Sequence, residues 1–163
     1  MQESQTPEIK VLSIIHLALL SGQILFALIS LYIVYGKGYS PNPSWQSNAQ
    51  IFMFLTVAIG AAGYLGGSIL FKKKVKQINA GIKPVAEKLN EYRAASINRW
   101  ALMEFPVLFC IILFFVSHDA LIIILAGIFI FLFLTLRPSL QKTSSDMGIS
   151  EIEIQQIGNS SPQ

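Results

Sequence analysis

The sequence predicts an all-α fold, an integral membrane bundle of four helices. Of its 163 residues, 53% are hydrophobic and only 13% are charged. That is too little charge to cover the surface of a soluble domain of this size. The apolar residues stand in four long blocks instead of being dispersed along the chain. Most basic residues gather between the second and third blocks. These three observations together indicate a multi-pass membrane protein.

Each apolar block is a candidate membrane span. A helix needs roughly 20 apolar residues to cross a hydrocarbon core of about 30 Å. The blocks cover residues 11–35, 49–71, 97–116 and 120–136. The fourth is short, but it holds no charge and can use flanking residues. We therefore expect one transmembrane domain over residues 1–138 and a polar cytoplasmic tail over residues 139–163.

The basic residues predict the orientation. Loops rich in Lys and Arg stay in the cytoplasm, so the connection between spans two and three should lie there, with both termini. Such clusters also attract anionic lipid headgroups, here at Lys72, Lys73, Lys74 and Lys76. The expected location is the inner (plasma) membrane, and nucleic acid is not expected as a partner. The connection holds 8 of the 12 basic residues: Lys72, Lys73, Lys74, Lys76, Lys83, Lys88, Arg93 and Arg99.

This basic connection should itself be a long helical hairpin. In "FKKKVKQINAG" the helix of span two can continue to Gly81, a residue type that commonly follows a helix end. In "KPVAEKLNEYRAASINRW" a helix can restart at Pro84, with Val85, Leu89 and Tyr92 on one face. We expect this second arm to run without a break into span three.

Two further helix starts are visible in the sequence. Asp119 is a natural N-cap for a helix that begins at Ala120, which makes spans three and four antiparallel neighbours. In the tail, Ser150 and Glu153 form a capping box that predicts a short helix over residues 151–157.

One carboxylate, Glu104, lies inside the apolar run "RWALMEFPVLFCIILFFV". A charge there is costly unless it is paired or protonated. His16 and Tyr64 are expected at a comparable depth, so the three side chains form a candidate polar cluster. Pro106 is expected to kink the helix and to free the carbonyl of Leu102. The cluster is either a site that handles protons or cations, with Glu104 titrating, or a buried polar clasp.

Small residues line one stretch of span two, "AIGAAGYLGGSIL". Gly63 and Gly67 form a GxxxG pair, and Ala62 with Gly66 forms a parallel pair. Such faces let helices approach closely in lipid. They serve either self-association or packing within the bundle, and we favour packing within the bundle.

Motifs of enzymes and cofactor sites are absent from the sequence. It holds no GxSxG, HExxH or P-loop pattern. His16 and His118 are expected at opposite ends of the bundle, which argues against a bis-histidine haem. The single Cys110 and the scattered acidic residues do not make a metal site. We therefore expect no enzymatic activity, cofactor or metal.

The segments "YRAASINRWALMEFPVLF" and "TLRPSLQK" resemble a class of small four-span bacterial inner-membrane proteins. Members carry a similar Arg…Ala-Leu-x-Glu-x-Pro segment and an Arg-Pro exit from the last helix. The resemblance covers the second half of the chain and implies the four-span fold without an activity. The combination of Gly60, Gly63 and Gly67, a basic hairpin and Glu104 is also similar to the proteolipid c subunits of rotary ATPases. In this chain, however, the carboxylate is expected nearer the cytoplasmic face, and two additional spans flank the hairpin.

These patterns lead to three functional expectations. The first is a non-enzymatic integral membrane protein that is a structural or accessory component. The second is a small proton- or cation-coupled transporter that uses Glu104. The third is a proteolipid-like ring subunit.

Overall fold

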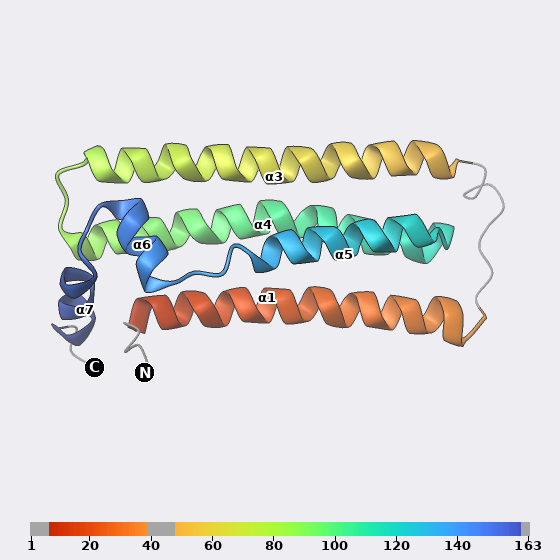
Figure 1. Cartoon of the computed structure of the whole chain (residues 1–163), viewed down its shortest axis with the longest axis horizontal. Coiled ribbons are helices and arrows are strands. Elements are labelled where there is room, and N and C mark those ends of the chain that lie inside the picture. Colours follow the sequence, from red (N-terminus) through yellow and green to blue (C-terminus); the bar gives the residue numbers. More distant parts are fainter. Residues whose placement is uncertain (1–6, 39–47, 161–163) are drawn as a thin grey trace.

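The structure, a computed structural model, describes residues 7–38 and 48–160. These two ranges hold helices and no strand, which confirms the all-α class. Most of the expected external loop lies outside them. Long helices run alongside one another and two short helices gather at one end (Figure 1). The elements are α1 (Pro7–Leu31) with a π-helical turn η1 (Tyr32–Gly36), α3 (Ala49–Ala80), α4 (Val85–Ser117), α5 (Ala120–Leu134), α6 (Leu140–Met147) and α7 (Glu151–Ser160).

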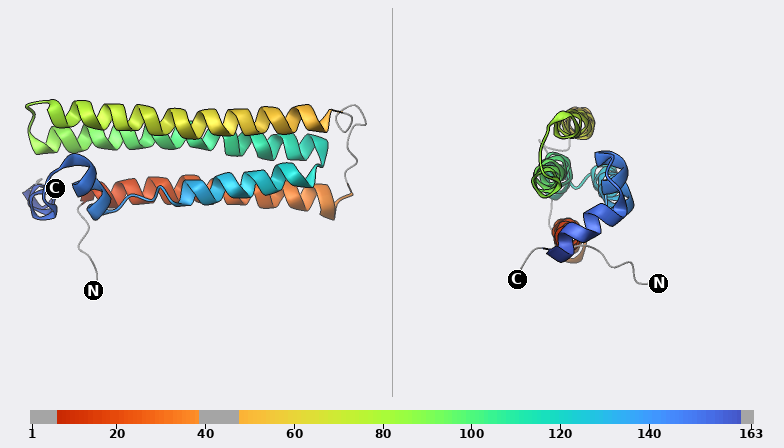
Figure 2. Two further views of the ribbon diagram at one scale, coloured as in Figure 1. Left: turned by 45° about the horizontal axis from the view of Figure 1, so that its top comes forward. Right: turned by 90° about the vertical axis from the view of Figure 1, so that its left-hand side faces the viewer.

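Helices α4 and α5 lie between α1 and α3 (Figure 2). In the most apolar stretch of α4 50% of the residues are buried, against 22% in each of α1 and α3. The outer helices therefore present long apolar sides, in which Leu17 is 61% and Phe54 is 78% exposed. Exposed apolar surface of this extent is a mark of contact with lipid or with another protein.

In the described part of the chain, three helical segments are long and apolar enough to cross a membrane: Pro7–Gly36, Gln50–Ala80 and Val85–Ser117. The segment expected to form the fourth span is the helix α5, which is apolar but has only 15 residues. At 1.5 Å per residue α5 covers about 22 Å, less than the hydrocarbon core. The four-span topology and the position of the termini stay predictions.

The junction between α4 and α5 agrees with the sequence. The backbone N–H of Leu121 donates to Oδ1 of Asp119 at 2.9 Å, so Asp119 caps α5 as expected. The preceding residue, His118, adopts a left-handed conformation with φ +58°, which ends α4. The two helices pack as neighbours through a fully buried cluster that includes Phe114 of α4 and Ile122 of α5.

Both arms of the α3–α4 hairpin are helical beyond the apolar region. Helix α3 continues through the lysines to Ala80, and α4 begins at Val85. Gly81 follows the helix, but its backbone is extended, with φ −78°. It does not adopt the positive φ that glycine tolerates better than other residues. Pro84 stands one position before the helix, as its N-cap.

At the end where the α3–α4 hairpin turns, five helices enclose an apolar cluster, which we call the head core. The predicted face of α4 points into it, with Leu89 4% and Tyr92 5% exposed and Val85 packed at its edge. Because α6 and α7 fold back onto this end, the tail is part of one body with the bundle. The head core consists of Ile9, Phe71, Val75, Ile78, Leu89, Tyr92, Ala95, Leu140, Met147 and Ile154.

Helix α6 was not expected from the sequence, which predicted one short helix in the polar tail. Ser139 caps α6 by accepting from the backbone N–H of Lys142 at 3.2 Å. Gly148, with φ +63°, ends it in a left-handed conformation. The expected start of α7 is present, since Ser150 Oγ accepts from the N–H of Glu153 at 3.2 Å. That helix runs to Ser160 and not to residue 157.

Candidate functional site

His16 of α1 lies in the interior of the bundle and is 2% exposed. Its Nε2 donates to the carbonyl of Phe133 at the end of α5, at 3.1 Å. The imidazole ring stacks on the ring of Phe133 at 4.8 Å and meets the edge of Trp100 at 5.1 Å. The histidine therefore contacts both α4 and α5 from α1, and the backbone carbonyl of Phe133 accepts from its Nε2.

Glu104 and Tyr64 do not share this contact. Tyr64 packs beside the apolar cluster that holds Trp100, whereas Glu104 is partly exposed. Within residues 7–38 and 48–160, no hydrogen bond or ion pair joins Glu104 to another residue. The three members of the predicted polar cluster are thus not bonded to one another.

A polar line on α1 was missed in the sequence. His16, Gln23 and Ser30 are spaced by seven residues, and all three are buried, with Gln23 at 0% exposure. A period of seven keeps residues on one face of a helix, so this spacing was a signal that could have found them. Neither Oε1 nor Nε2 of Gln23 has a hydrogen-bond partner among the described residues.

Pro106 acts at the contact between α3 and α4. Proline has no N–H, so the carbonyl of Leu102 lacks its usual partner within the helix. That carbonyl faces Gly63 of α3: a Cβ added at Gly63 would lie 2.7 Å from it and 2.7 Å from Cγ of Pro106. A glycine is therefore required where the freed carbonyl meets the neighbouring helix.

The other small residues of α3 divide into two groups. Gly67 lies against α4, because its added Cβ would be 3.4 Å from the carbonyl of Arg99. Gly60 lies against α5, where an added Cβ would overlap the ring of Phe129. By contrast, an added Cβ at Gly66 meets nothing within 4 Å, and Ala62 is exposed. The pair Gly63 and Gly67 therefore packs inside the bundle, while Ala62 and Gly66 face outward.

Hydrogen bonds at the edge of the head core join its helices. Tyr92 donates its hydroxyl to Oδ2 of Asp146 at 2.8 Å, and Asn79 donates to the carbonyl of the same aspartate at 2.9 Å. These two bonds fasten α6 to both arms of the hairpin. The Lys142 ammonium donates to the carbonyl of Thr135 at 2.8 Å, which satisfies the C-terminal end of α5. The sequence did not point to Asp146.

The hairpin turn carries its own ion pairs. Lys83 lies 3.0 Å from Glu87 and also contacts Glu91, and Lys74 lies 3.6 Å from Glu91. The hydrogen bond to Glu91, followed by that to Glu87, raises the pKa of Lys83 above its usual value. The two carboxylates at the turn therefore stabilise the charged form of Lys83.

The four lysines expected to meet lipid are all exposed, but they face different ways. On the same stretch of helix, Phe71, Val75 and Ile78 point inward at helical spacing. Lys73 and Lys74 border a groove between α3 and α4. Lys72 borders a second hollow, beside Arg137 and α6, and Lys76 borders neither.

Over residues 7–38 and 48–160, no three His, Cys, Asp or Glu side chains lie together in a way that could hold a metal ion. The chain matches no protein-family model, no curated protein and no solved structure.

Proposed function

We propose that the chain is a non-enzymatic integral membrane protein, a structural or accessory component that holds a folded head at the cytoplasmic face of the inner (plasma) membrane. The observation that carries this proposal is the continuity of α3 and α4. Each passes from an apolar region with an exposed apolar side directly into the head core. Five helices converge on the head, which makes it a rigid platform at the end of the bundle.

In this proposal α5 is the fourth span. It packs along α4 with Ile122, Ala126 and Phe133 fully buried, and it is bounded by Asp119 at one end and Arg137 at the other. Local thinning of the bilayer and the apolar flank that includes Leu136 offset its short length. With α5 inserted, the two ends of the chain lie on the same side.

The orientation is tested by reporter fusions. Fusions after Gly81 and at the C-terminus should both report the cytoplasm, because the basic residues gather at that end. A fusion in the loop at position 43 should report the opposite side. An external signal after Gly81 would overturn the proposed orientation. If the fusions at position 43 and at the C-terminus both reported the external side, α5 would not cross the membrane.

A second candidate function is proton- or cation-coupled transport with Glu104. The buried polar line of His16, Gln23 and Ser30 favours it, since polar side chains inside a membrane often mark ion pathways. Against it, buried apolar residues such as Val107, Ile111 and Phe114 fill the interior beyond Glu104. We therefore expect proteoliposomes to show no proton flux above the lipid background.

Glu104→Gln should leave that background flux unchanged and should barely alter thermal stability, because the carboxylate has no bonded partner among the described residues. A flux that the substitution abolishes would establish transport and displace the proposed function. The ring-subunit alternative requires a large assembly, so the mass of the detergent-solubilised protein decides it. Because Gly60, Gly63 and Gly67 already pack against helices of their own chain, we expect a small complex.

A further inference from the structure

A groove with a volume of about 420 Å³ lies between α3 and α4 where the apolar region meets the head. The end of the groove farther from the head is apolar, and there Leu70 is 57% and Leu102 is 40% exposed. The groove forms because small residues leave space between the two helices: Gly67 has no side chain, and those of Ala94 and Ala95 are small. From Gly67 to Gln77 the groove extends over about 15 Å at helical rise.

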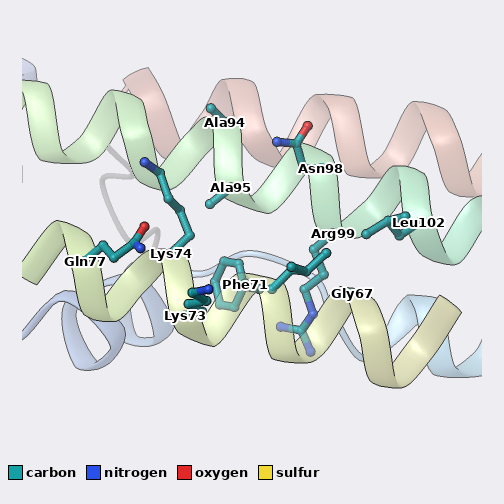
Figure 3. A pocket seen from close by; sticks show the side chains of 11 residues that line it. Gly67, Phe71, Lys73, Lys74, Gln77, Ala94, Ala95, Asn98, Arg99 and Leu102 are labelled. Carbon is teal, nitrogen blue, oxygen red and sulfur yellow. The ribbon is translucent and has the colours of Figure 1, made fainter. Parts of the chain in front are cut away.

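The end of the groove nearer the head is polar and basic. Lys73, Lys74 and Gln77 border this end on α3. Arg99 lies further along α4, opposite Gly67, and its guanidinium turns back over Phe71. Figure 3 shows Lys74 reaching from α3 toward α4, and Arg99 reaching from α4 across α3. The lining residues include no acidic side chain. The groove therefore changes from apolar to cationic along its length.

Neighbouring residues of the protein accept from only some of the N–H donors of Arg99. Its guanidinium lies over the ring of Phe71, 5.0 Å from the centroid, and donates to Ser68 Oγ at 3.3 Å. Its buried Nε has no hydrogen-bond partner among the described residues. A half-buried guanidinium is well suited to a phosphate, because its planar set of N–H donors matches the several acceptor oxygens of the phosphate.

Two carboxylates lie near the charged groups of the groove. Asp146 borders the neighbouring hollow together with Arg99, and there it accepts from the Tyr92 hydroxyl. Glu91 is the nearest carboxylate on α4 and lies 3.6 Å from Lys74, but it is also engaged by Lys83. Lys73 forms no ion pair within the described residues. Lys73 and Arg99 therefore supply the charge that an anionic ligand would meet.

We propose that this groove binds one anionic phospholipid. The phosphate lies between Lys73 and Arg99, and an acyl chain runs along Leu70 and Leu102 toward the bilayer. The lysines lie toward the head, the Arg99 guanidinium lies in the middle of the groove, and Leu102 lies toward the apolar region, so a headgroup and an acyl chain can occupy the groove in that order. The site rests on the proposed insertion of α3 and α4 in a bilayer, and it does not depend on which side the head occupies.

The test is native mass spectrometry of the full chain in detergent, titrated with phosphatidylglycerol or phosphatidylcholine. One phosphatidylglycerol should be retained in preference to phosphatidylcholine. Lys73→Gln should weaken its binding about fivefold, the factor that corresponds to about 1 kcal/mol per basic residue near an anionic surface. Lys76→Gln is the matched control, because it removes the same charge from the same helix outside the groove, and it should bind like wild type.

A second variant tests the shape of the groove without a change in charge. Ala94→Leu fills the groove from an exposed position, so the helix content should stay normal while retention of phosphatidylglycerol falls. Equal losses in Lys73→Gln and Lys76→Gln, or equal binding of the two lipids, would overturn the proposal in favour of diffuse attraction. Displacement of the lipid by excess inorganic phosphate would also overturn it, because the site would then serve free phosphate. Binding in micelles is independent of orientation, so failure here differs from failure of the reporter fusions.

Discussion

The head and the interior of the long bundle are held together in different ways. In the head, large apolar side chains such as Phe71 and Ile154 enclose a core, and hydrogen bonds between different helices close it. In the bundle, several buried hydroxyls bond to carbonyls of their own helix, as Thr56 does to Phe52 and Ser117 to Leu113. There, α3 approaches α4 through glycines.

The difference follows from the surroundings proposed for each region. Water drives apolar side chains together, so the head gains stability from every large residue it buries. Lipid is as apolar as the helices, so close packing of backbones is what holds helices together in it. Four substitutions test this contrast, and they are described from the largest expected effect to the smallest.

Ile154→Ala should loosen the head most. The side chain is fully buried, and its truncation should cost about 2–5 kcal/mol. Because α7 is a short terminal element, the loss should appear as faster hydrogen exchange and faster proteolysis of the tail. Ile152→Ala is the control, since Ile152 is 68% exposed on the same helix. Equal protection of the tail in both variants would show that the head core does not hold α7.

Gly63→Ala should destabilise the bundle by overpacking, by about 1–3 kcal/mol. The added methyl group would lie 2.7 Å from the Leu102 carbonyl, which belongs to the backbone and cannot rotate away. Gly66→Ala places the same group where nothing lies within 4 Å, and it should be neutral or slightly stabilising. Thermal unfolding in detergent measures both. Equal stability of the two variants would mean that α3 does not press on α4 at Gly63.

Gln23→Leu should raise the unfolding temperature slightly. It removes a fully buried amide that has no partner among the described residues. A buried polar group without a hydrogen bond costs at least about 1 kcal/mol of stability, and the substitution should recover this amount. Thr56→Val is the comparison, because the buried Thr56 hydroxyl bonds to its own helix and its loss should be nearly neutral. A clear loss of stability in Gln23→Leu would show that the amide has a partner in the membrane and would favour the transport alternative.

Lys83→Gln should have the smallest effect, because the ion pairs at the turn are exposed to water and salt screens them. The raised pKa of Lys83 means that its contribution is fully present below the ordinary value of 10.5 and is lost only as the pH rises through the raised value. Far-ultraviolet circular dichroism of wild type and variant should therefore coincide at neutral pH. A difference that depends on pH near neutrality would contradict this assignment.

Sequence reasoning was most successful where the signal is local. Asp119 caps α5 and Ser150 caps α7 because a cap depends only on residues a few positions away. Apolar blocks likewise marked the long helices. The Ser139 and Gly148 signals for α6 were equally local, and the polar composition of the tail concealed them.

Contacts between distant segments could not be predicted in the same way. His16 was expected to meet Glu104, but it bonds to Phe133, which lies 117 positions away. Similar depth in a membrane does not determine which helix face a side chain occupies, and that face depends on how all the long helices pack. Asp146 was missed for the same reason, because its partners Tyr92 and Asn79 come from another part of the chain.

The uninterrupted passage of α3 and α4 into the head has a mechanical consequence. Neither arm has a joint at the level where the apolar region ends, so a tilt of the two helices must carry the head with it. The nine residues from Lys72 to Ala80 form an arm of about 13 Å, and a tilt of about 10° would move its tip by about 2 Å. Changes in bilayer thickness alter helix tilt. If α3 and α4 span a bilayer as proposed, a change in membrane thickness would therefore displace the head at the surface.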